Sequence, residues 1–238
     1  MCGRYAASAS QELLVETFEI DEVAGPLPAP KFNVAPTDPV PAVLERTRDD
    51  GTVRKLVTLR WGLVPSWAGD ASGAARMINA RVETVAEKPA FRKAFAARRC
   101  LLPADGFYEW HVTSRSDARG RPVKQPYFIH PAGGGLLVMA GLYEFWRAPD
   151  GSWLPTAAII TTRAGDDLGH IHDRMPMVVP PAAWDAWLDP HRTDDARELL
   201  AVPAPDLVAH PVSNLVNRVA NDGPELIVPL PPEESGRE

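Results

Sequence analysis

Proline is the residue that most constrains what this chain can fold into. The 238 residues include 25 prolines, and they are scattered along the whole length. Because proline breaks helix interiors and lacks a backbone donor, this spacing favours short strands joined by turns over long helices. Apolar residues at helical spacing still predict helices at 11–18, 88–99 and 181–188, with a short fourth at 194–200.

The remaining apolar and alternating runs are typical of β-strands. A hairpin is predicted from 40–46 and 53–60 around Asp49-Asp50-Gly51, and a polar loop is expected between residues 112 and 126. Further strands are expected at 100–103, 106–112, 126–129, 136–143 and 156–162. Strands and helices do not alternate regularly, which argues against a doubly wound parallel sheet. We expect one α+β domain at residues 1–230, with a mostly antiparallel, barrel-like sheet, a few peripheral helices and an acidic tail at 231–238.

Composition limits the compartment and the class of protein. Hydrophobic residues make up 45% and charged residues 24%, which are ordinary values for a globular protein. No apolar stretch reaches the roughly 18 residues that a membrane-spanning helix needs, and the first thirty residues lack a secretory signal pattern. Two cysteines, Cys2 and Cys100, do not make a disulfide framework. We therefore expect a cytoplasmic protein with no membrane partner, and Cys100 as a small buried strand residue.

Charge is spread unevenly along the chain. The net charge of −6 argues against bulk, non-specific adhesion to nucleic acid. Residues 76–99, however, carry seven basic side chains against two acidic ones. Such a local basic stretch fits either a groove for an anionic ligand or a solvated helix face.

Cys2 is the first candidate functional residue. Removal of Met1 would leave Cys2 with a free amine and a thiol on adjacent carbons. The amine titrates at about 7.7–8.0 and the thiol at about 8.5, so both nucleophilic forms are present near neutral pH. This aminothiol can open an amide, or trap an aldehyde as an imine that closes to a five-membered thiazolidine. Position alone does not decide between these roles and an incidental cysteine.

Two segments of similar sequence each place a glutamate where a buried carboxylate is possible. Gly106-Phe107-Tyr108-Glu109-Trp110 resembles Gly141-Leu142-Tyr143-Glu144-Phe145-Trp146. Residues two apart on a strand share a face, so each glutamate would lie beside an apolar neighbour. A carboxylate there is either paired or has a raised pKa, which suits general acid–base catalysis. The alternative is a solvated glutamate on an edge strand.

Other polar residues interrupt apolar or proline-rich segments. Asn79 and Arg81 are two apart, so an extended segment would point both side chains the same way. His170 and His172 stand in one short loop, where His172 followed by Asp173 fits a proton carrier near neutral pH. His-x-His without a third ligand is a weak metal signal, and no nucleophile elbow or phosphate loop is present. We expect no metal and no cofactor.

Taken together, these segments resemble the SRAP (SOS response-associated peptidase) family, whose members shield abasic sites in single-stranded DNA. The resemblance runs from Met1 to about Pro229. Its carriers include Met1-Cys2-Gly3-Arg4-Tyr5, Phe32-Asn33-Val34-Ala35-Pro36-Thr37, Trp61-Gly62-Leu63-Val64-Pro65, Asn79-Ala80-Arg81-Val82-Glu83-Thr84, Gly106-Phe107-Tyr108-Glu109-Trp110 and His172-Asp173-Arg174-Met175-Pro176. So many ordered matches favour a functional Cys2, and they imply the SRAP fold.

The resemblance implies a covalent reaction with damaged DNA. The amine of Cys2 would attack the aldehyde of a ring-opened abasic site, and its thiol would close a thiazolidine crosslink. Glu109 would assist proton transfer at the sugar and the amine. His172 would assist ring opening and shuttle protons, and Asn79 would orient the aminothiol and the sugar.

The resemblance also implies a DNA-binding surface. Arg4 and Arg81 match residues that hold the flanking phosphates, a role suited to a guanidinium. Asn33 belongs to the same expected DNA-binding set. Trp67 stands where the family presents an apolar wedge to an unstacked base, and a plain core tryptophan is the alternative. The expected partner is single-stranded DNA containing abasic sites. We expect a monomer that is associated with the nucleoid when it is bound to damaged DNA.

Two departures from the family pattern concern DNA contacts. Residues 163–167 are more acidic than the resemblance implies, and Ala220 precedes Asn221 where a basic residue is expected. Neither lies in the set of Cys2, Asn79, Glu109 and His172.

Two other readings use the same residues. A thiol peptidase, acting on other proteins or only on its own Met1, would use Cys2 as nucleophile and His172 or Glu109 as base. A binding module without turnover would leave Cys2 incidental. The basic stretch at 76–99 favours the DNA readings over a general peptidase.

Overall fold

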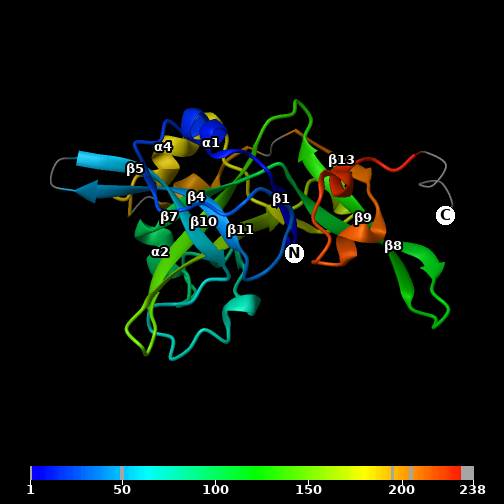
Figure 1. The fold of residues 1–238 in the computed structure, drawn as a ribbon, viewed down its shortest axis with the longest axis horizontal. Helices are drawn as coiled ribbons and strands as arrows, with labels where there is room; N and C mark the ends of the chain where they lie inside the picture. Colours follow the sequence, from blue (N-terminus) through cyan, green and yellow to red (C-terminus); the bar gives the residue numbers. More distant parts are fainter. Residues whose placement is uncertain (1, 49–50, 194–195, 204–205, 232–238) are drawn as a thin grey trace.

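Two β-sheets make up most of the fold (Figure 1). The computed structural model describes residues 2–48, 51–193, 196–203 and 206–231. The smaller sheet contains β1 (Tyr5–Ala7), β3 (Lys31–Val34), β8 (Gly106–Ser116), β9 (Pro122–Pro131) and β13 (Leu207–Pro211). Its strand order is β13-β9-β8-β1-β3, and every recorded pairing in it is antiparallel.

The larger sheet closes on itself. Its strands are β2 (Glu22–Ala24), β4 (Pro39–Arg48), β5 (Gly51–Trp61), β6 (Asn79–Arg81), β7 (Arg99–Ala104), β10 (Leu137–Arg147), β11 (Trp153–Arg163) and β12 (Arg174–Pro176). The order is β12-β11-β10-β7-β4-β5-β2, and β11 also pairs in parallel with β5 through Thr156↔Arg60 and Ala157↔Trp61. That extra pairing closes β4, β5, β11, β10 and β7 into a barrel, which confirms the predicted α+β, barrel-like fold.

Alternating side chains fill the barrel. Because successive residues of a strand face opposite sides, every second residue points inward. The inward residues are fully or almost fully buried and include Val40, Ala42, Leu44, Leu59, Trp61, Cys100, Leu102, Met139, Tyr143, Ala157 and Ile159. Cys100 is therefore the buried strand residue that the sequence predicts.

Short helices cover the outside of the barrel. They are α1 (Gln11–Phe18), α2 (Arg92–Ala97) and α4 (Trp184–Leu188), whereas α3 (Asp166–Gly169) contributes Leu168 to the cluster that contains Cys2. Phe18, Phe95 and Trp187, from α1, α2 and α4, belong to one buried cluster with the outward residues of the barrel strands, such as Val43 and Leu142. Ser10 caps α1, and its Oγ accepts from the Leu13 amide.

The predicted helices at 11–18 and 181–188 are confirmed. The first is α1, and the second is a 3₁₀ turn at Pro181–Ala183 that leads into α4. The helix predicted at 88–99 is wrong in extent, because only Arg92–Ala97 is helical. Arg99 enters the sheet instead, pairing with Leu142 of β10.

The fourth predicted helix is a 3₁₀ helix at Ala196–Leu200, while residues 194 and 195 lie outside the described chain. The polar loop predicted at 112–126 is also wrong in extent. Strands β8 and β9 continue into it as a two-stranded ribbon through pairs such as Val112↔Lys124. Hydrogen bonds between β8 and β9 thus extend both strands through polar residues that do not alternate with apolar ones.

The proposed division at residue 230 stays a prediction. Apart from Pro231, the expected acidic tail lies outside the described residues, as do Asp49 and Asp50 of the predicted hairpin turn. Within the described chain, no helix combines the length and apolar character needed to cross a bilayer.

One end of the barrel carries the N-terminal segment. We call this end the proximal mouth; its inward residues are Val40, Trp61, Met139 and Ile159, and Tyr5 of β1 packs edge-on against Trp61 with ring centroids 5.0 Å apart. The candidate site lies here.

Candidate active site

Strand pairing brings Cys2 to the proximal mouth. Strand β1 runs antiparallel to β8 with Tyr5 opposite Phe107, and the Tyr108 amide donates to the Arg4 carbonyl at 2.9 Å. Continued by two residues, this register sets Gly3 opposite Glu109. Cys2 precedes Gly3, and the charge of Glu109 acts directly on the Cys2 thiol, so the two side chains are near each other.

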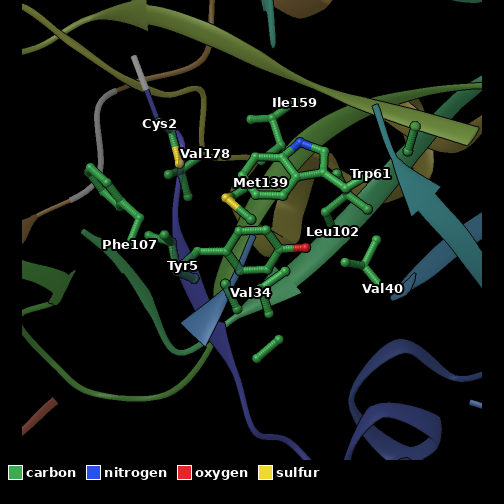
Figure 2. Close-up of a cluster of buried hydrophobic side chains, with 14 of the residues drawn as sticks. Cys2, Tyr5, Val34, Val40, Trp61, Leu102, Phe107, Met139, Ile159 and Val178 are labelled. Atoms are coloured by element: carbon green, nitrogen blue, oxygen red, sulfur yellow. The ribbon is translucent and has the colours of Figure 1, made fainter. Parts of the chain in front are cut away.

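Cys2 is fully buried, with an exposed fraction of 0%. It belongs to the apolar cluster that contains Tyr5, Phe107 and Val178, as Figure 2 shows. Burial, and then the negative charge of Glu109, raise the pKa of the Cys2 thiol far above its usual range. The thiol therefore carries its proton at neutral pH.

Asn79 fixes the backbone of Cys2. It begins β6, which pairs in parallel with β11 through Asn79↔Ile159. Its Nδ2 donates to the Cys2 carbonyl at 2.7 Å. Among the described residues, its Oδ1 is buried without a hydrogen-bond partner. Asn79 thus holds the nucleophile in place and keeps a buried acceptor beside it.

Glu109 lies in β8 and is 4% exposed. Burial raises its pKa to about 7, an effect that the positive N-terminus opposes and Asp173 reinforces. A carboxyl with this pKa can donate or accept a proton near neutral pH. Glu144, in the similar segment at 141–146, is also buried, but it forms an ion pair with Arg98 at 2.8 Å. Neither glutamate is solvated, and only Glu109 lies by Cys2.

His172 stands in the loop between α3 and β12. Its Nδ1 accepts from the Arg174 amide at 3.0 Å, which assigns the proton of the neutral ring to Nε2. Burial lowers the pKa of His172, so the neutral imidazole prevails at pH 7. Asp173 also lies 3.1 Å from Nδ1, but its side chain is 86% exposed and water screens its charge.

The His172 loop and Glu109 share one electrostatic neighbourhood. Asp173 and Lys124 both act on the pKa of Glu109 and on that of His172. His111, on the same face of β8 as Glu109, contacts the His170 carbonyl through Nδ1 at 2.9 Å. The structure thus brings Cys2, Asn79, Glu109 and His172 to one region from four separate segments.

Arg4 and Asn33 form a different arrangement from the expected one. Arg4 donates from Nη1 to Asn33 Oδ1 at 2.7 Å and to the Val216 carbonyl at 2.9 Å. Asn33 is 0% exposed, and its Nδ2 donates to the carbonyls of Val216, Arg218 and Asn221. Burial disfavours the expected direct contact of Asn33 with DNA. Its position fits a support for Arg4 and for the 214–221 segment instead.

Arg81 opens onto a second hollow. Arg81 is exposed at the end of β6 and lines a cavity of about 640 Å³ together with Arg163 and Arg174. Arg174 forms an ion pair with Glu83 at 2.6 Å and donates to the Thr161 carbonyl. The sequence predicts no role for Arg163 or Arg174, although Arg174 belongs to the same short segment as His172.

Comparison with known proteins decides the family. Residues 1–219 match the family model described as SOS response associated peptidase (SRAP). The chain belongs to the SRAP family. It is 41% identical over 234 residues to the abasic site processing protein YoqW of Bacillus subtilis (strain 168), covering 95% of this chain and 99% of that protein.

Further relatives agree with this assignment. The SRAP chain is 35% identical over 240 residues to the abasic site processing protein YedK of Escherichia coli (strain K12), covering 97% of this chain and all of that protein. A crystal structure of a protein from Bacteroides thetaiotaomicron superposes with a TM-score of 0.80 at 22% identity, covering 96% of this chain and 100% of that one. That structure supports the fold alone.

The basic stretch at 76–99 does not form one surface in this SRAP chain. Arg99 is buried and donates to the carbonyls of Phe95, Ala96 and Trp187, so it joins α2 to α4. Arg98 is held by Glu144. Arg99 therefore lies in neither a groove nor a solvated helix face, and the charge of Arg98 is neutralised by Glu144. Trp67, by contrast, is 66% exposed, which excludes the alternative of a core tryptophan.

Metal ligation has no candidate site in the described residues. No group of three or more His, Cys, Asp and Glu side chains there is arranged to hold an ion.

Proposed function

We propose that this SRAP chain is an abasic-site processing protein that forms a thiazolidine crosslink through Cys2 after removal of Met1. The names of YoqW and YedK support the abasic-site part of the proposal. The observation that carries the chemistry is the placement of Cys2. Asn79 holds its carbonyl at 2.7 Å, and a carboxyl with a pKa of about 7 lies near its thiol.

The reaction balances without an oxidant or reductant. The neutral Cys2 amine attacks the aldehyde carbon of the ring-opened sugar, forming a C–N bond and a carbinolamine. Glu109 protonates the departing hydroxyl, water leaves and an imine forms. The thiol sulfur then bonds to the imine carbon, and the thiol proton passes to the nitrogen. One water is lost overall.

The state of the thiol sets the order of these steps. Burial and Glu109 raise the thiol pKa, so the thiolate is scarce and the amine attacks first. His172, neutral with its proton on Nε2, would shuttle protons during ring opening and in reversal of the adduct. Asn79 Oδ1 offers an acceptor to the amine or to a sugar hydroxyl.

Single-stranded DNA would follow the basic and aromatic residues around the site. Arg4 and Arg81 would hold the flanking phosphates through their guanidinium groups. Trp67 would stack on an unpaired base, an interaction that contributes about 1–3 kcal/mol. We propose a monomer acting in the cytoplasm, and at the nucleoid when bound to damaged DNA.

A thiol peptidase is the second candidate, because the family is described as an SOS response associated peptidase. Cys2 would then attack an amide as thiolate. The raised pKa of the buried thiol disfavours this route for a substrate in trans. Self-removal of Met1 is the form of peptidase activity that the proposal retains.

Intact-mass spectrometry tests the proposal. The purified protein is weighed before and after mixing with a single-stranded oligonucleotide that bears one abasic site. We expect the mass without Met1, and then an adduct equal to protein plus oligonucleotide minus one water. Cys2→Ser should give no adduct that survives denaturation, whereas Cys100→Ala, which changes the other buried cysteine, should react like the parent. A mature Cys2 that gives no adduct would contradict the proposal.

A further inference from the structure

The barrel has a second open end, which we call the distal mouth. A cavity of about 580 Å³ opens there between β4, β5, β10 and β11, with Arg46, Phe145 and Trp153 in its lining. Arg147 stands beside Trp153 and is counted with these three as the distal rim. The wall of the cavity contains Leu44, Val57, Leu59 and Pro155. The volume lies in the range of small-ligand pockets, about 300–1,000 Å³.

The distal mouth is remote from Cys2. Along β4, Val40 belongs to the proximal mouth and Arg46 to the distal rim, so about 20 Å separates the two ends at roughly 3.3 Å per residue. Figure 1 shows the β4–β5 hairpin projecting away from the N-terminus. Buried Tyr143 and Cys100 fill the barrel between the ends. Nothing in the proposed crosslinking reaction uses the distal mouth.

The distal rim combines exposed aromatic rings with guanidinium groups. Trp153 is 63% exposed, and the Arg147 guanidinium lies 6.0 Å from its ring centroid. The Arg46 guanidinium lies 4.5 Å above the Phe145 ring. Within the described chain neither arginine forms an ion pair, whereas Lys55, which also lines the cavity, is neutralised by Glu22 at 2.8 Å. The rim therefore carries two positive charges beside two aromatic faces.

A direct contact links this rim to the Trp67 loop. The Trp146 indole Nε1 donates to the Ala68 carbonyl at 2.7 Å, which fastens the loop to β10. The next residue of β10, Arg147, lies opposite Trp153 in the register of β10 and β11. Trp67 and Trp153 are the two strongly exposed tryptophans of the described chain. They therefore lie on elements that contact each other.

We propose that the distal mouth binds a further nucleotide of the same single-stranded DNA that reaches the proximal mouth. The base would stack on Trp153 and reach into the cavity toward Phe145, while Arg46 and Arg147 hold its phosphates. Stacking on aromatic side chains tolerates any base, and arginine matches phosphate geometry. The positive rim and the anionic strand are complementary. This inference rests on the proposed function, because it names the same DNA as ligand.

Length-dependent binding of undamaged DNA tests the inference. Oligothymidylates of about 5 and about 16 nucleotides span the site sizes of single-strand-binding folds. Their dissociation constants are measured by fluorescence anisotropy at several salt concentrations. For the longer oligonucleotide, Trp153→Ala should weaken binding about tenfold, the effect of losing one stacked base. Trp153→Phe should restore most of the affinity, because an aromatic face remains.

The charges of the rim have a separate readout. The double variant Arg46→Gln, Arg147→Gln should reduce the slope of log affinity against log salt by about 1.4, since each of the two phosphate contacts to a single strand contributes about 0.7. Arg197→Gln, at an exposed residue that lies outside the 76–99 stretch and pairs with Glu87, is the control and should leave the slope unchanged. Thermal unfolding checks that each variant is folded.

The outcomes separate this inference from the proposed function. If an abasic oligonucleotide crosslinks but Trp153→Ala leaves binding of the longer oligothymidylate unchanged, the distal mouth is not a DNA site and the proposed function stands. If no crosslink forms while Trp153→Ala still weakens that binding tenfold, the distal site stands and the crosslinking proposal fails. Tighter binding of an unrelated anionic peptide than of DNA at this rim would also overturn the inference.

Discussion

Two glutamates in almost the same local sequence have different environments. Phe107-Tyr108-Glu109 and Leu142-Tyr143-Glu144 both place a carboxyl beside apolar residues, and both carboxyls are buried. Glu144 reaches Arg98, which comes from the end of α2, whereas Glu109 lies near Cys2 and has its pKa raised to about 7. The sequence predicts an apolar neighbour for each glutamate and leaves a solvated edge-strand position as the alternative. It does not predict the partner of each, because that depends on which segment packs against the strand.

The raised pKa of Glu109 makes a prediction for stability. Burial raises the pKa from 4.5 to about 7, so between these values the folded protein keeps a proton that the unfolded chain has released. The associated stability is complete below about pH 4.5 and is lost as the pH rises through 7, by up to about 3 kcal/mol. Glu109→Gln cannot release this proton. Its free energy of unfolding should therefore fall less than that of the parent between pH 5 and pH 8.

Urea unfolding at the two pH values measures this difference. Glu144→Gln is the control for removal of a buried carboxyl: it removes the partner of Arg98 and should destabilise the protein at both pH values. The same Glu109→Gln preparation should form the crosslink about 10²-fold more slowly, the usual minimum for loss of a general acid–base group. If the free energy of unfolding changed with pH equally in Glu109→Gln and in the parent, Glu109 would titrate as an ordinary carboxyl.

At the scale of elements, local signals predict that a helix or strand exists better than they predict its bounds. Ser10 and the spacing of Leu14 and Phe18 predict α1 correctly, because a capping side chain and an apolar face are both local. The predicted helix at 88–99 fails where Arg99 pairs with β10, and the predicted loop at 112–126 fails where β8 and β9 continue. In both places hydrogen bonds to a distant or returning strand override local preference.

The segment 214–221 depends on one buried amide. Asn33 Nδ2 donates to three carbonyls of this segment, and its Oδ1 accepts from Arg4. Asn33→Ala would leave buried acceptors without their donor, at a cost of about 1–3 kcal/mol. We expect a lower thermal midpoint and faster amide exchange within 214–221.

Asn33→Asp is the informative partner of that variant. It keeps the acceptor toward Arg4 but replaces the donor with a second oxygen facing three carbonyls, so it should be at least as destabilising as Asn33→Ala. Asn214→Ala, at an exposed residue of the same segment, serves as the control. If amide exchange within 214–221 is unchanged in Asn33→Ala, the other contacts of the segment suffice to hold it.

At the scale of the whole molecule, barrel closure decides where the candidate sites lie. The parallel pairing of β11 with β5 joins strands from opposite halves of the chain, and no local pattern predicts such a pairing or its register. Closure creates two mouths, and the smaller sheet covers one of them with the segment that carries Cys2. The sequence, through its resemblance to the SRAP family, predicts the chemistry of the proximal mouth. The distal mouth follows only from the closed barrel.

The interior layer between the mouths should tolerate no added volume at Gly141. A Cβ there would lie 2.8 Å from Cys100 Sγ and 3.0 Å from Leu102 Cδ1, so Gly141→Ala overpacks the barrel at a cost of about 1–3 kcal/mol. Cys100→Ala removes the nearer atom, and the double variant should recover part of the loss, with a coupling of at least about 0.5 kcal/mol. Gly133→Ala, where a Cβ meets nothing within 4 Å, is the control and should be close to neutral. Denaturant unfolding of the four proteins measures the cycle, and strictly additive effects would mean that the strands move apart to admit the methyl group.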